Sequence, residues 1–489
     1  MKIQPIAYSD FYKTDHRRQY PEGTTFVYSN FTPRGSRIPE IDKIVVFGIQ
    51  YFIKEYLIMQ FNKNFFYKSR KEAISNYKRR LDASLGKDAV SMEHIEALHK
   101  LGYLPIEIKS LDEGTLCNMR VACLTIKNTH PDFFWLTNFF ETLLSAVLWG
   151  MMTSATIANR YREILDCWAE RTSDIPEFVQ WQAHDFSMRG MIGIEAGCMS
   201  GAGHLLSFTG TDTIPAIDFL EEYYYADAEN ELIGGSVPAT EHSVMSLGKP
   251  EEEIETFRRL VTQIYPKGIV SIVSDTWDFW KVLTEYLPKL KTEIMSRDGK
   301  AVIRPDSGDP IKIICGDPNA EFDSPQRKGA IQILYEIFGG TLNSKGYLQL
   351  NSHIGLIYGD SITLDRCKAI CEGLENKGYA STNIVLGVGS YTYQYNTRDT
   401  FGFAMKATFG IVDGCPVNIF KDPKTDSGIK KSAKGLLRVN TDGSMSECVS
   451  FEEEQEGLLH TVFKDGCLVK QITLSEIRTN LRKSNNAIL

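Results

Sequence analysis

From about residue 180 onward, short apolar runs repeatedly end in a polar or glycine turn and then pass into helical stretches. Apolar runs of this length, alternating with helices, predict the strands of a parallel sheet. Seven such units, roughly 25 to 55 residues apart, favour closure into an irregular (βα) barrel over an open sheet. The predicted strand ends are Ala183-His184-Asp185, Phe208 to Asp212, Ser236 to Ala239, Ser271 to Asp275, Val302 to Asp306, Ile357 to Asp360, and Ile384 to Gly387.

The chain on either side of these units has a mixed pattern. Helical periodicity at Phe47 to Phe61 and at Met92 to Gly102 alternates with short apolar runs. The longest apolar stretch, about Leu143 to Ala158, is interrupted by polar residues and predicts a buried core helix rather than a membrane span. We expect the residues after 400 to pack back on the N-terminal region. The predicted domains are therefore an α/β domain, 1–145 completed by 400–489, and the barrel, 146–399, which packs against it and carries most of the site.

Composition and charge narrow the class of protein. The chain has 489 residues, of which 43% are hydrophobic and 24% charged, as in globular proteins. A net charge of -8 lacks the basic excess that binds nucleic acid. The N-terminal residues contain no apolar signal segment, and the ten cysteines show no CxxC pair or zinc spacing. These features predict a cytoplasmic protein with reduced thiols that binds neither nucleic acid nor membrane.

Residues suited to phosphate, sugar hydroxyls and magnesium gather at the predicted strand ends. In a barrel these ends converge on one face, where barrel enzymes keep their sites. Four basic side chains stand beside a strand end or a glycine turn, where arginine can bind phosphate in a bidentate manner. A single side chain of this kind more often forms a surface salt bridge, and only their repetition along one face favours anion binding. These candidates are Arg189, His242, Arg304 and Arg398.

Three short motifs add to this picture. Arg304-Pro305-Asp306 places a cation and a carboxylate two residues apart, on the same side of a strand end. In Gly359-Asp360, the glycine permits close backbone approach beside a carboxylate. Gly387-Val388-Gly389-Ser390 can form a nest of backbone N–H groups for a phosphate. The alternatives are a capped helix start for the first two motifs and a tight turn for the third.

Candidates for binding a flat ring are Phe186 and Tyr12, although aromatic residues more often belong to a core. Asp212 is an acceptor-only group that can bind the N–H₂ group of a ligand amide and would repel a ligand carboxylate. This charge would set the choice of substrate.

Together these motifs resemble those of the nicotinamide phosphoribosyltransferases along essentially the whole chain. The resemblance implies the type II phosphoribosyltransferase fold, an α/β fold in which an irregular (βα) barrel lies beside a composite α/β domain. It also implies a head-to-tail homodimer with sites at the interface. The implied reaction joins nicotinamide to phosphoribosyl pyrophosphate and yields nicotinamide mononucleotide for NAD synthesis. The motifs are Asp10 to Lys13, Gln19 to Pro21, His184 to Gly190, Gly210 to Thr213, Ser236 to His242, Ser274 to Asp278, Arg304 to Gly308, Gly359-Asp360, Thr397 to Asp399 and Phe420 to Pro423.

The resemblance also implies residue roles. Tyr12 from the partner subunit and Phe186 would stack on the two faces of the pyridine ring, while Asp212 binds the amide. Mg²⁺ would be held largely by the pyrophosphate, so its protein ligands are not predicted. ATP would phosphorylate His242, with a neutral pyrophosphate-binding histidine as the alternative. The predicted catalytic residues are His242, Asp278 and Asp306. The predicted substrate-binding residues are Tyr12, Arg34, Phe186, Arg189, Asp212, Ser236, Ala239, Ser274, Arg304, Pro305, Gly359, Asp360, Gly389, Ser390, Arg398, Lys421 and Lys430.

Two departures from animal members point to the bacterial or phage branch. Ser390-Tyr391 stands where animal members carry a glycine triplet, and the segment after Arg34-Gly35-Ser36 is short. Three rivals stay open. A nicotinate phosphoribosyltransferase would have to accept a carboxylate, against which Asp212 argues. A non-catalytic scaffold has no need of polar strand ends. A metal-dependent hydrolase would lack the usual paired histidine ligands and would use Asp275, Asp278, Asp306 and Asp360.

Overall fold

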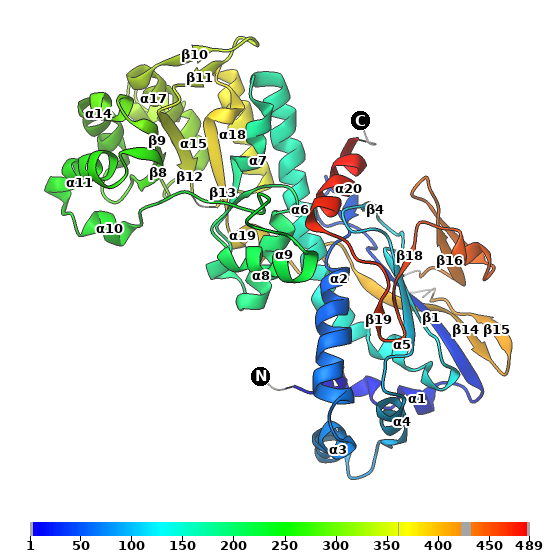
Figure 1. Ribbon diagram of the computed structural model, residues 1–489. Coiled ribbons are helices and arrows are strands. Elements are labelled where there is room, and N and C mark those ends of the chain that lie inside the picture. Colours follow the sequence, from blue (N-terminus) through cyan, green and yellow to red (C-terminus); the bar gives the residue numbers. More distant parts are fainter. Residues whose placement is uncertain (1–2, 360, 422–431, 487–489) are drawn as a thin grey trace. The chain divides into compact units, whose positions relative to one another are not determined.

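The computed structural model describes residues 3–359, 361–421 and 432–486, which form two compact units (Figure 1). Unit 1 comprises 1–156, 219–226 and 396–489, and unit 2 comprises 157–218 and 227–395. Two of the four divisions fall within continuous helices, α6 (Glu141–Thr172) and α9 (Ile214–Tyr224), and the other two follow Ala226 and Tyr395. Because a continuous helix contains no turn or linker signal, the sequence does not mark the first two points.

Unit 1 is built on a seven-stranded antiparallel sheet with the order β15-β14-β1-β5-β3-β18-β19. Strand β1, third in this order, pairs with β5 on one side and with β14 on the other, so residues from both ends of the chain share one sheet (Figure 1). The strands are β1 (Thr24–Thr32), β3 (Ile106–Ser110), β5 (Leu124–Asn128), β14 (Ala404–Val412), β15 (Cys415–Asn418), β18 (His460–Lys464) and β19 (Cys467–Leu468), and a separate pair is β2 (Lys43–Val45) with β4 (Leu116–Asn118).

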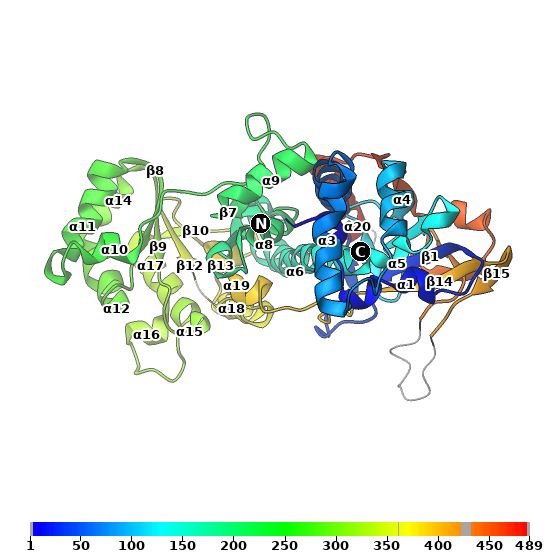
Figure 2. The ribbon, with the colours of Figure 1, turned by 90° about the horizontal axis from the view of Figure 1, so that it is seen from below.

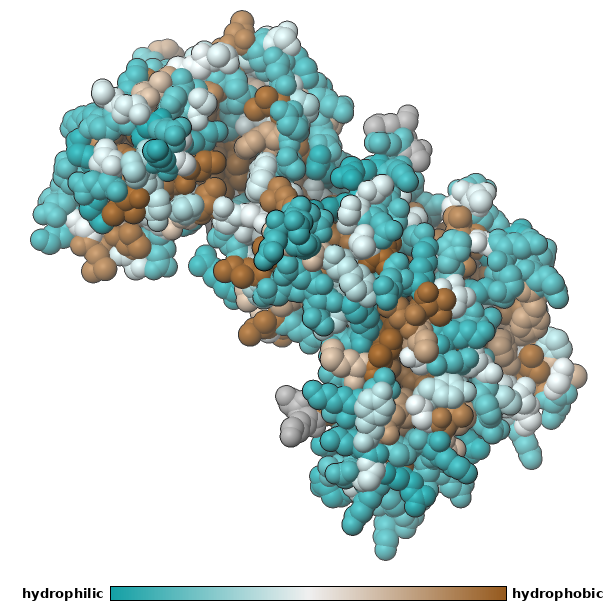
Figure 3. All heavy atoms as spheres, in the orientation of Figure 1, coloured by the Kyte–Doolittle hydropathy of each residue, from teal (hydrophilic) through white to brown (hydrophobic). Residues whose placement is uncertain are grey.

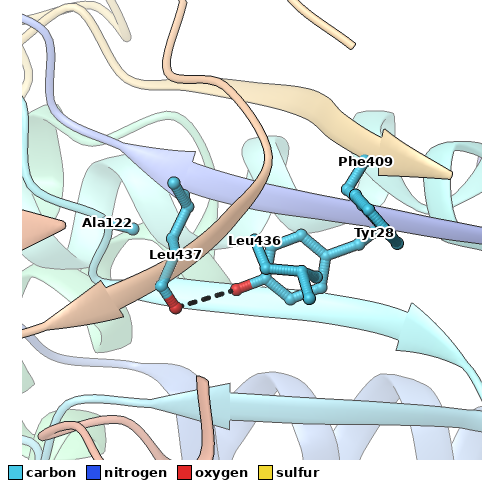
Figure 4. Close-up of a cluster of buried hydrophobic side chains, with 5 residues drawn as sticks. All are labelled: Tyr28, Ala122, Phe409, Leu436 and Leu437. Atoms are coloured by element: carbon cyan, nitrogen blue, oxygen red, sulfur yellow. Dashed lines mark hydrogen bonds between the residues drawn. The ribbon is translucent and has the colours of Figure 1, made fainter. Parts of the chain in front are cut away.

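A buried hydrophobic cluster joins this sheet to the hairpin of β16 (Leu436–Val439) and β17 (Met445–Val449), as Figure 4 shows. Tyr28 of β1 and Phe409 of β14 pack with Ala122, Leu436 and Leu437. The Tyr28 hydroxyl donates a hydrogen bond of 3.4 Å to the carbonyl oxygen of Leu437. The ring is therefore buried while its polar end has a partner.

The helix predicted from Phe47 to Phe61 begins at α2 (Ile49–Tyr51) and continues in π-helical turns over Phe52–Gln60. Its start is fixed by the buried carboxylate of Glu113, which accepts hydrogen bonds from the backbone N–H groups of Gly48 (2.7 Å) and Gln50 (2.6 Å). A side chain at Gly48 would meet Met151, and its φ of 96° suits glycine. The other helices of this unit are α1 (His16–Gln19), α3 (Arg70–Leu85), α4 (Glu93–Leu101), α5 (Leu136–Phe139) and α20 (Leu474–Asn486).

Unit 2 is built on a curled sheet of six parallel strands with the order β7-β6-β13-β12-β9-β8. Segment 235–239 contacts both edge strands through single parallel bridges, Gly210–Gly235 and Ala239–Ser271. The predicted α/β class with an irregular (βα) barrel is thus confirmed, although the third predicted strand is reduced to these bridges. The strands are β6 (Ala183–Asp185), β7 (Gly210–Thr211), β8 (Lys267–Val273), β9 (Asp298–Arg304), β12 (Ile354–Tyr358) and β13 (Ile384–Val388).

Helices alternate with these strands along the chain and surround the curled sheet, as Figure 2 shows for α14, α15 and α17. A short hairpin, β10 (Gly340–Leu342) and β11 (Leu348–Leu350), lies beside them. The helices are α7 (Val179–Gln182), α8 (Ile194–His204), α10 (His242–Ser246), α11 (Glu253–Arg259), α12 (Phe279–Lys281), α13 (Leu287–Lys289), α14 (Lys291–Met295), α15 (Pro310–Cys315), α16 (Pro325–Lys328), α17 (Ala330–Phe338), α18 (Leu364–Asn376) and α19 (Ser390–Tyr393).

The apolar side chains of α6, including Leu144, Leu148 and Met151, are buried in the fold, as predicted for a core helix. Among the described helices, none alone is long and apolar enough to span a membrane, and one bent pair, Pro131–Phe139 with Glu141–Thr172, meets this criterion by length and composition only. The face seen in Figure 3 is mostly hydrophilic, with hydrophobic residues in scattered groups.

Candidate functional site

The residues predicted from the strand ends of unit 2 lie at one edge of its parallel sheet. Because all strands run in the same direction, their carboxyl ends meet at this edge. The described residues are Phe186 after β6, Asp212 after β7, Ser236 and Ala239 in the bridging segment, Ser274 and Asp278 after β8, Arg304, Pro305 and Asp306 at the end of β9, Gly359 after β12, and Gly389 and Ser390 after β13.

Asp212 is held by two hydrogen bonds to the same carboxylate oxygen. Oδ1 lies 2.9 Å from Nε2 of His184 and accepts a bond of 2.6 Å from the Ser236 hydroxyl. Burial favours the neutral acid, but the bonds from His184 and Ser236 and the charge of Arg304 outweigh it and lower the pKa of Asp212 below its ordinary value. The Asp212 side chain stays 44% exposed. The site therefore presents an ionised acceptor, as a ligand amide requires.

Two glycines let the strands approach the candidate ring-binding residue and its neighbours. A Cβ atom on Gly387 would lie 2.7 Å from Cδ2 of Phe186, so only glycine allows β13 to run beside that ring. A Cβ atom on Gly359 would lie 2.0 Å from Oδ1 of Asp306. Gly359, predicted to allow close backbone approach, thus makes room for the carboxylate of Asp306 at the end of the neighbouring strand β9.

Arg304 and Asp306 lie near each other, with Nε and Oδ1 3.7 Å apart. The Arg304 guanidinium also donates a 2.9 Å bond from Nη2 to the carbonyl oxygen of Thr240, which orients it. Asp275 supports the loop, because its Oδ2 accepts bonds from the Asp306 backbone N–H (2.9 Å) and the Ser307 hydroxyl (2.6 Å). Asp275 is not among the residues predicted for phosphoribosyl transfer, although its place after β8 is a signal that could have found it.

The remaining residues of this edge are held by local contacts. Arg189 is exposed on a turn, Met188–Gly190, and Ser390 lies over that turn, since a Cβ atom on Gly190 would be 2.1 Å from its Oγ. His242, the exposed first residue of α10, has Nδ1 3.3 Å from the Thr276 hydroxyl.

Two predicted residues have side-chain contacts that serve the local fold. The Ser274 hydroxyl donates to the carbonyl oxygen of Ile272 over 2.7 Å. Asp278 caps α12 by accepting a 3.1 Å bond from the Lys281 backbone N–H. The predicted catalytic role of Asp278 stays a prediction beside this structural one.

Unit 1 carries its own group of basic side chains. Lys13 and Lys406 lie 2.6 Å and 3.7 Å from the carboxylate of Glu141. Burial and the charges of Arg34, Lys13 and Lys421 lower the pKa of Lys406, against the attraction of Glu141. Lys406 is not among the predicted residues, because it lies within β14 rather than at a turn.

The other predicted residues of unit 1 have separate contacts. Tyr12 is 61% exposed, and Nζ of Lys13 lies 4.9 Å from its ring centroid. Arg34 donates from Nε to the carbonyl oxygen of Gly402 over 2.9 Å, and Nη2 of Arg398 lies 3.5 Å from Asp399. Asp360 and Lys430 lie outside the described residues.

Two protein-family models and several named relatives match this chain. The model of the nicotinate phosphoribosyltransferase family matches residues 181–467, and that of the nicotinamide phosphoribosyltransferase N-terminal domain matches 6–108. The nicotinamide phosphoribosyltransferase of Acinetobacter baylyi is 57% identical over 98% of this chain and 97% of its own length. That of Xanthomonas campestris is 32% identical over 96% and 97%.

Two solved structures share the fold. Nicotinate-nucleotide pyrophosphorylase from Pyrococcus furiosus gives a TM-score of 0.57 at 13% identity, covering 99% of this chain and 96% of that one. Human nicotinic acid phosphoribosyltransferase gives 0.56 at 13% identity, covering 98% and 93%. The matched family model spans more than half of the chain and the relatives span nearly all of it, so the chain belongs to the nicotinate phosphoribosyltransferase family and, within it, to the nicotinamide phosphoribosyltransferases.

Proposed function

We propose that this chain transfers the 5-phosphoribosyl group of phosphoribosyl pyrophosphate to nicotinamide, giving nicotinamide mononucleotide and pyrophosphate. The observation that carries the proposal is the ionised, half-exposed carboxylate of Asp212, which can accept from an amide and repels a carboxylate. The 57% identity to a nicotinamide phosphoribosyltransferase supports the same substrate over nicotinate.

The strand-end residues suit this chemistry. The bond between the ribose carbon C1 and the pyrophosphate oxygen breaks, and a bond from C1 to the pyridine nitrogen forms. As the ribose carbon becomes cationic and pyrophosphate leaves with the electron pair, Arg304 stabilises the leaving charge. Asp306 stands two residues from Arg304 and can accept hydrogen bonds from the ribose hydroxyls. Phe186 offers a flat surface for the pyridine ring.

Magnesium would be bound mainly through the pyrophosphate. Within the described residues, no group of three or more His, Cys, Asp or Glu side chains is placed to hold a metal ion by itself. One buried oxygen, Oδ1 of Asp275, has no hydrogen-bond partner among them and is the kind of ligand that Mg²⁺ prefers. Bound there with pyrophosphate, the cation would neutralise charge on the leaving group.

His242 is proposed to accept the γ-phosphoryl group of ATP, with ADP as the leaving group. Its Nδ1 faces the Thr276 hydroxyl, which leaves Nε2 as the nitrogen that can attack. His242→Ala should then abolish ATP hydrolysis while slow, uncoupled transfer to nicotinamide persists. Equal ATP hydrolysis by the variant would contradict this role and favour simple pyrophosphate binding.

A homodimer is proposed to complete each site with residues of the second copy. Tyr12, Ile192 and Tyr395 are large hydrophobic side chains that are 61%, 80% and 76% exposed. Such side chains gain free energy when a partner covers them. The basic group of unit 1, with Arg34, Lys406 and Lys421, suits the 5'-phosphate of a substrate held by the other copy. The ten free thiols favour a reducing compartment such as the cytoplasm.

The test is an incubation of the purified chain with phosphoribosyl pyrophosphate, Mg²⁺, ATP and equal amounts of nicotinamide and nicotinic acid, with the products separated by chromatography. Nicotinamide mononucleotide should dominate. A dominant nicotinate product would overturn the specificity, and pyrophosphate release without either nucleotide would overturn the transfer reaction itself.

A further inference from the structure

We propose that His184 is a positioning residue that sets substrate choice by holding Asp212 in one orientation. This inference rests on the proposed function and deepens it, since nicotinamide itself is expected to contact Asp212 and not His184. The structure assigns the imidazole the role of a fixed hydrogen-bond donor behind the carboxylate.

The backbone brings the two side chains together. His184 lies on β6, which pairs in parallel with β7 in the register His184 to Gly210, and Asp212 follows β7 directly. The resulting distance from Nε2 to Oδ1 is 2.9 Å. Because a carboxylate oxygen can only accept, Nε2 must carry the proton of this bond.

The imidazole is itself held by two neighbours. Its centroid lies 4.6 Å from that of Phe186, with 38° between the ring planes. A Cβ atom on Gly210 would lie 2.8 Å from Nδ1, so the ring occupies space that only glycine leaves open. The His184 side chain is 10% exposed, so little room is left for another rotamer.

The two oxygens of Asp212 therefore have different hydrogen-bond partners. His184 and Ser236 both donate to Oδ1, whereas Oδ2 has no hydrogen-bond donor among the residues that the structure describes. The carboxylate cannot turn without losing both bonds, so Oδ2 stays the acceptor for the amide N–H₂. An Asp212 free to rotate would still be charged but would meet the amide less often in the productive geometry.

The test compares His184→Leu, which removes the donor at similar volume, with His184→Gln, whose side-chain amide can still donate. In His184→Leu we expect the KM for nicotinamide to rise about tenfold. The ratio of kcat/KM for nicotinamide to that for nicotinate should fall about tenfold, because the Asp212 carboxylate loses the hydrogen bond that orients it. The KM for phosphoribosyl pyrophosphate should stay unchanged. His184→Gln should recover most of the ratio.

Gly210→Ala provides a second test, since the added methyl group displaces the imidazole ring without replacing the histidine itself. A lowered nicotinamide-to-nicotinate ratio in this variant supports the proposal even where His184→Leu does not fold. An unchanged ratio in the folded variants, or a Gln variant no better than the Leu variant, overturns it. If the wild-type chain forms no nicotinamide mononucleotide, the proposed function has failed instead, so the two failures are distinguishable.

Discussion

Two carboxylates, one in each unit, differ in how completely their oxygens are paired. Glu113 in unit 1 is 5% exposed, and its two oxygens accept from the N–H groups of Gly48 and Gln50 and from the Tyr224 hydroxyl at 3.0 Å. Asp212 in unit 2 keeps 44% of its side chain exposed, and its two donors, His184 and Ser236, both bind the same oxygen, Oδ1.

The difference separates an acid that supports the fold from one that can serve a ligand. The hydrogen bonds of Glu113 hold the start of α2 and the end of α9 together within unit 1. The hydrogen bonds of Asp212 orient its carboxylate, whose second oxygen can still accept a hydrogen bond from a ligand. The number of carboxylate oxygens that already have hydrogen-bond partners thus separates a structural acid from a ligand-binding one better than burial or charge alone.

The largest effect is expected at Arg304, which lies at the end of β9 with a bond to the Thr240 carbonyl oxygen and an ion pair with Asp306. Arg304→Ala should lower kcat/KM for phosphoribosyl pyrophosphate about 10²- to 10³-fold, because a charge-assisted contact to the leaving group is lost. Steady-state kinetics would measure this, with Arg258→Ala on α11 as the control for loss of a surface arginine. A loss below about threefold would remove Arg304 from the reaction.

Glu113 should affect stability and its pH dependence. Burial raises the pKa of Glu113 to about 7, from 4.5 in the unfolded chain, despite the opposing hydrogen bonds. Between these values the folded protein holds a proton that the unfolded chain has released, so stability falls as pH rises, by about 3 kcal/mol in total. Urea unfolding at pH 4.5, 6 and 8 should show this fall in the wild type and not in Glu113→Gln. Parallel pH profiles would contradict it.

Asp185 gives a sharper test, because it lies beside the site but is fully buried and paired. It accepts bonds from the backbone N–H and hydroxyl of Ser187 and from the hydroxyls of Thr211 and Thr213. Asp185→Ala leaves these donors unpaired and should cost about 2 kcal/mol of unfolding free energy. The nicotinamide-to-nicotinate ratio of the folded fraction should be unchanged. A changed nicotinamide-to-nicotinate ratio with an unchanged free energy of unfolding would contradict this, because it would show that an acid with all of its oxygens hydrogen-bonded can still act on the ligand.

The smallest effect is expected from the cap at Asp278. Asp278→Ala should lower the unfolding free energy by about 1 kcal/mol, and Asp278→Ser should restore it, since serine also caps helices. Thermal unfolding of both variants measures the cap. Activity lost equally in the two variants would show that the carboxylate itself is needed, which is the catalytic role predicted from the sequence.

The sequence predicted the parallel sheet well because its strand ends carry strong local signals. The apolar run before Arg304-Pro305-Asp306 and the glycines at 359 and 387 mark ends that the structure places at one edge. The assignment of Asp212 as an acceptor followed from its chemistry alone. Its partner His184 could not be predicted as such, because their contact depends on the register of two strands 26 residues apart in the chain.

The boundaries of the two units also depend on contacts between residues far apart in the chain, which local sequence patterns do not show. Residues 219–226 belong to unit 1 although the strands around them belong to unit 2. Tyr224 donates to Glu113, more than one hundred residues earlier in the chain, and nothing in the local pattern of α9 signals this contact. Lys406 was missed similarly, since its nearness to Glu141 comes from the packing of β14.

The most direct test of the central claim is a competition assay on Asp212→Asn beside the wild type, with phosphoribosyl pyrophosphate, Mg²⁺, ATP and equal nicotinamide and nicotinic acid. Asparagine has nearly the same size but no charge and carries a donor, so it can bind a carboxylate. We expect the wild type to form mainly nicotinamide mononucleotide and the variant to shift the product ratio toward the nicotinate nucleotide by about tenfold or more. A folded, active variant with the wild-type ratio would contradict it.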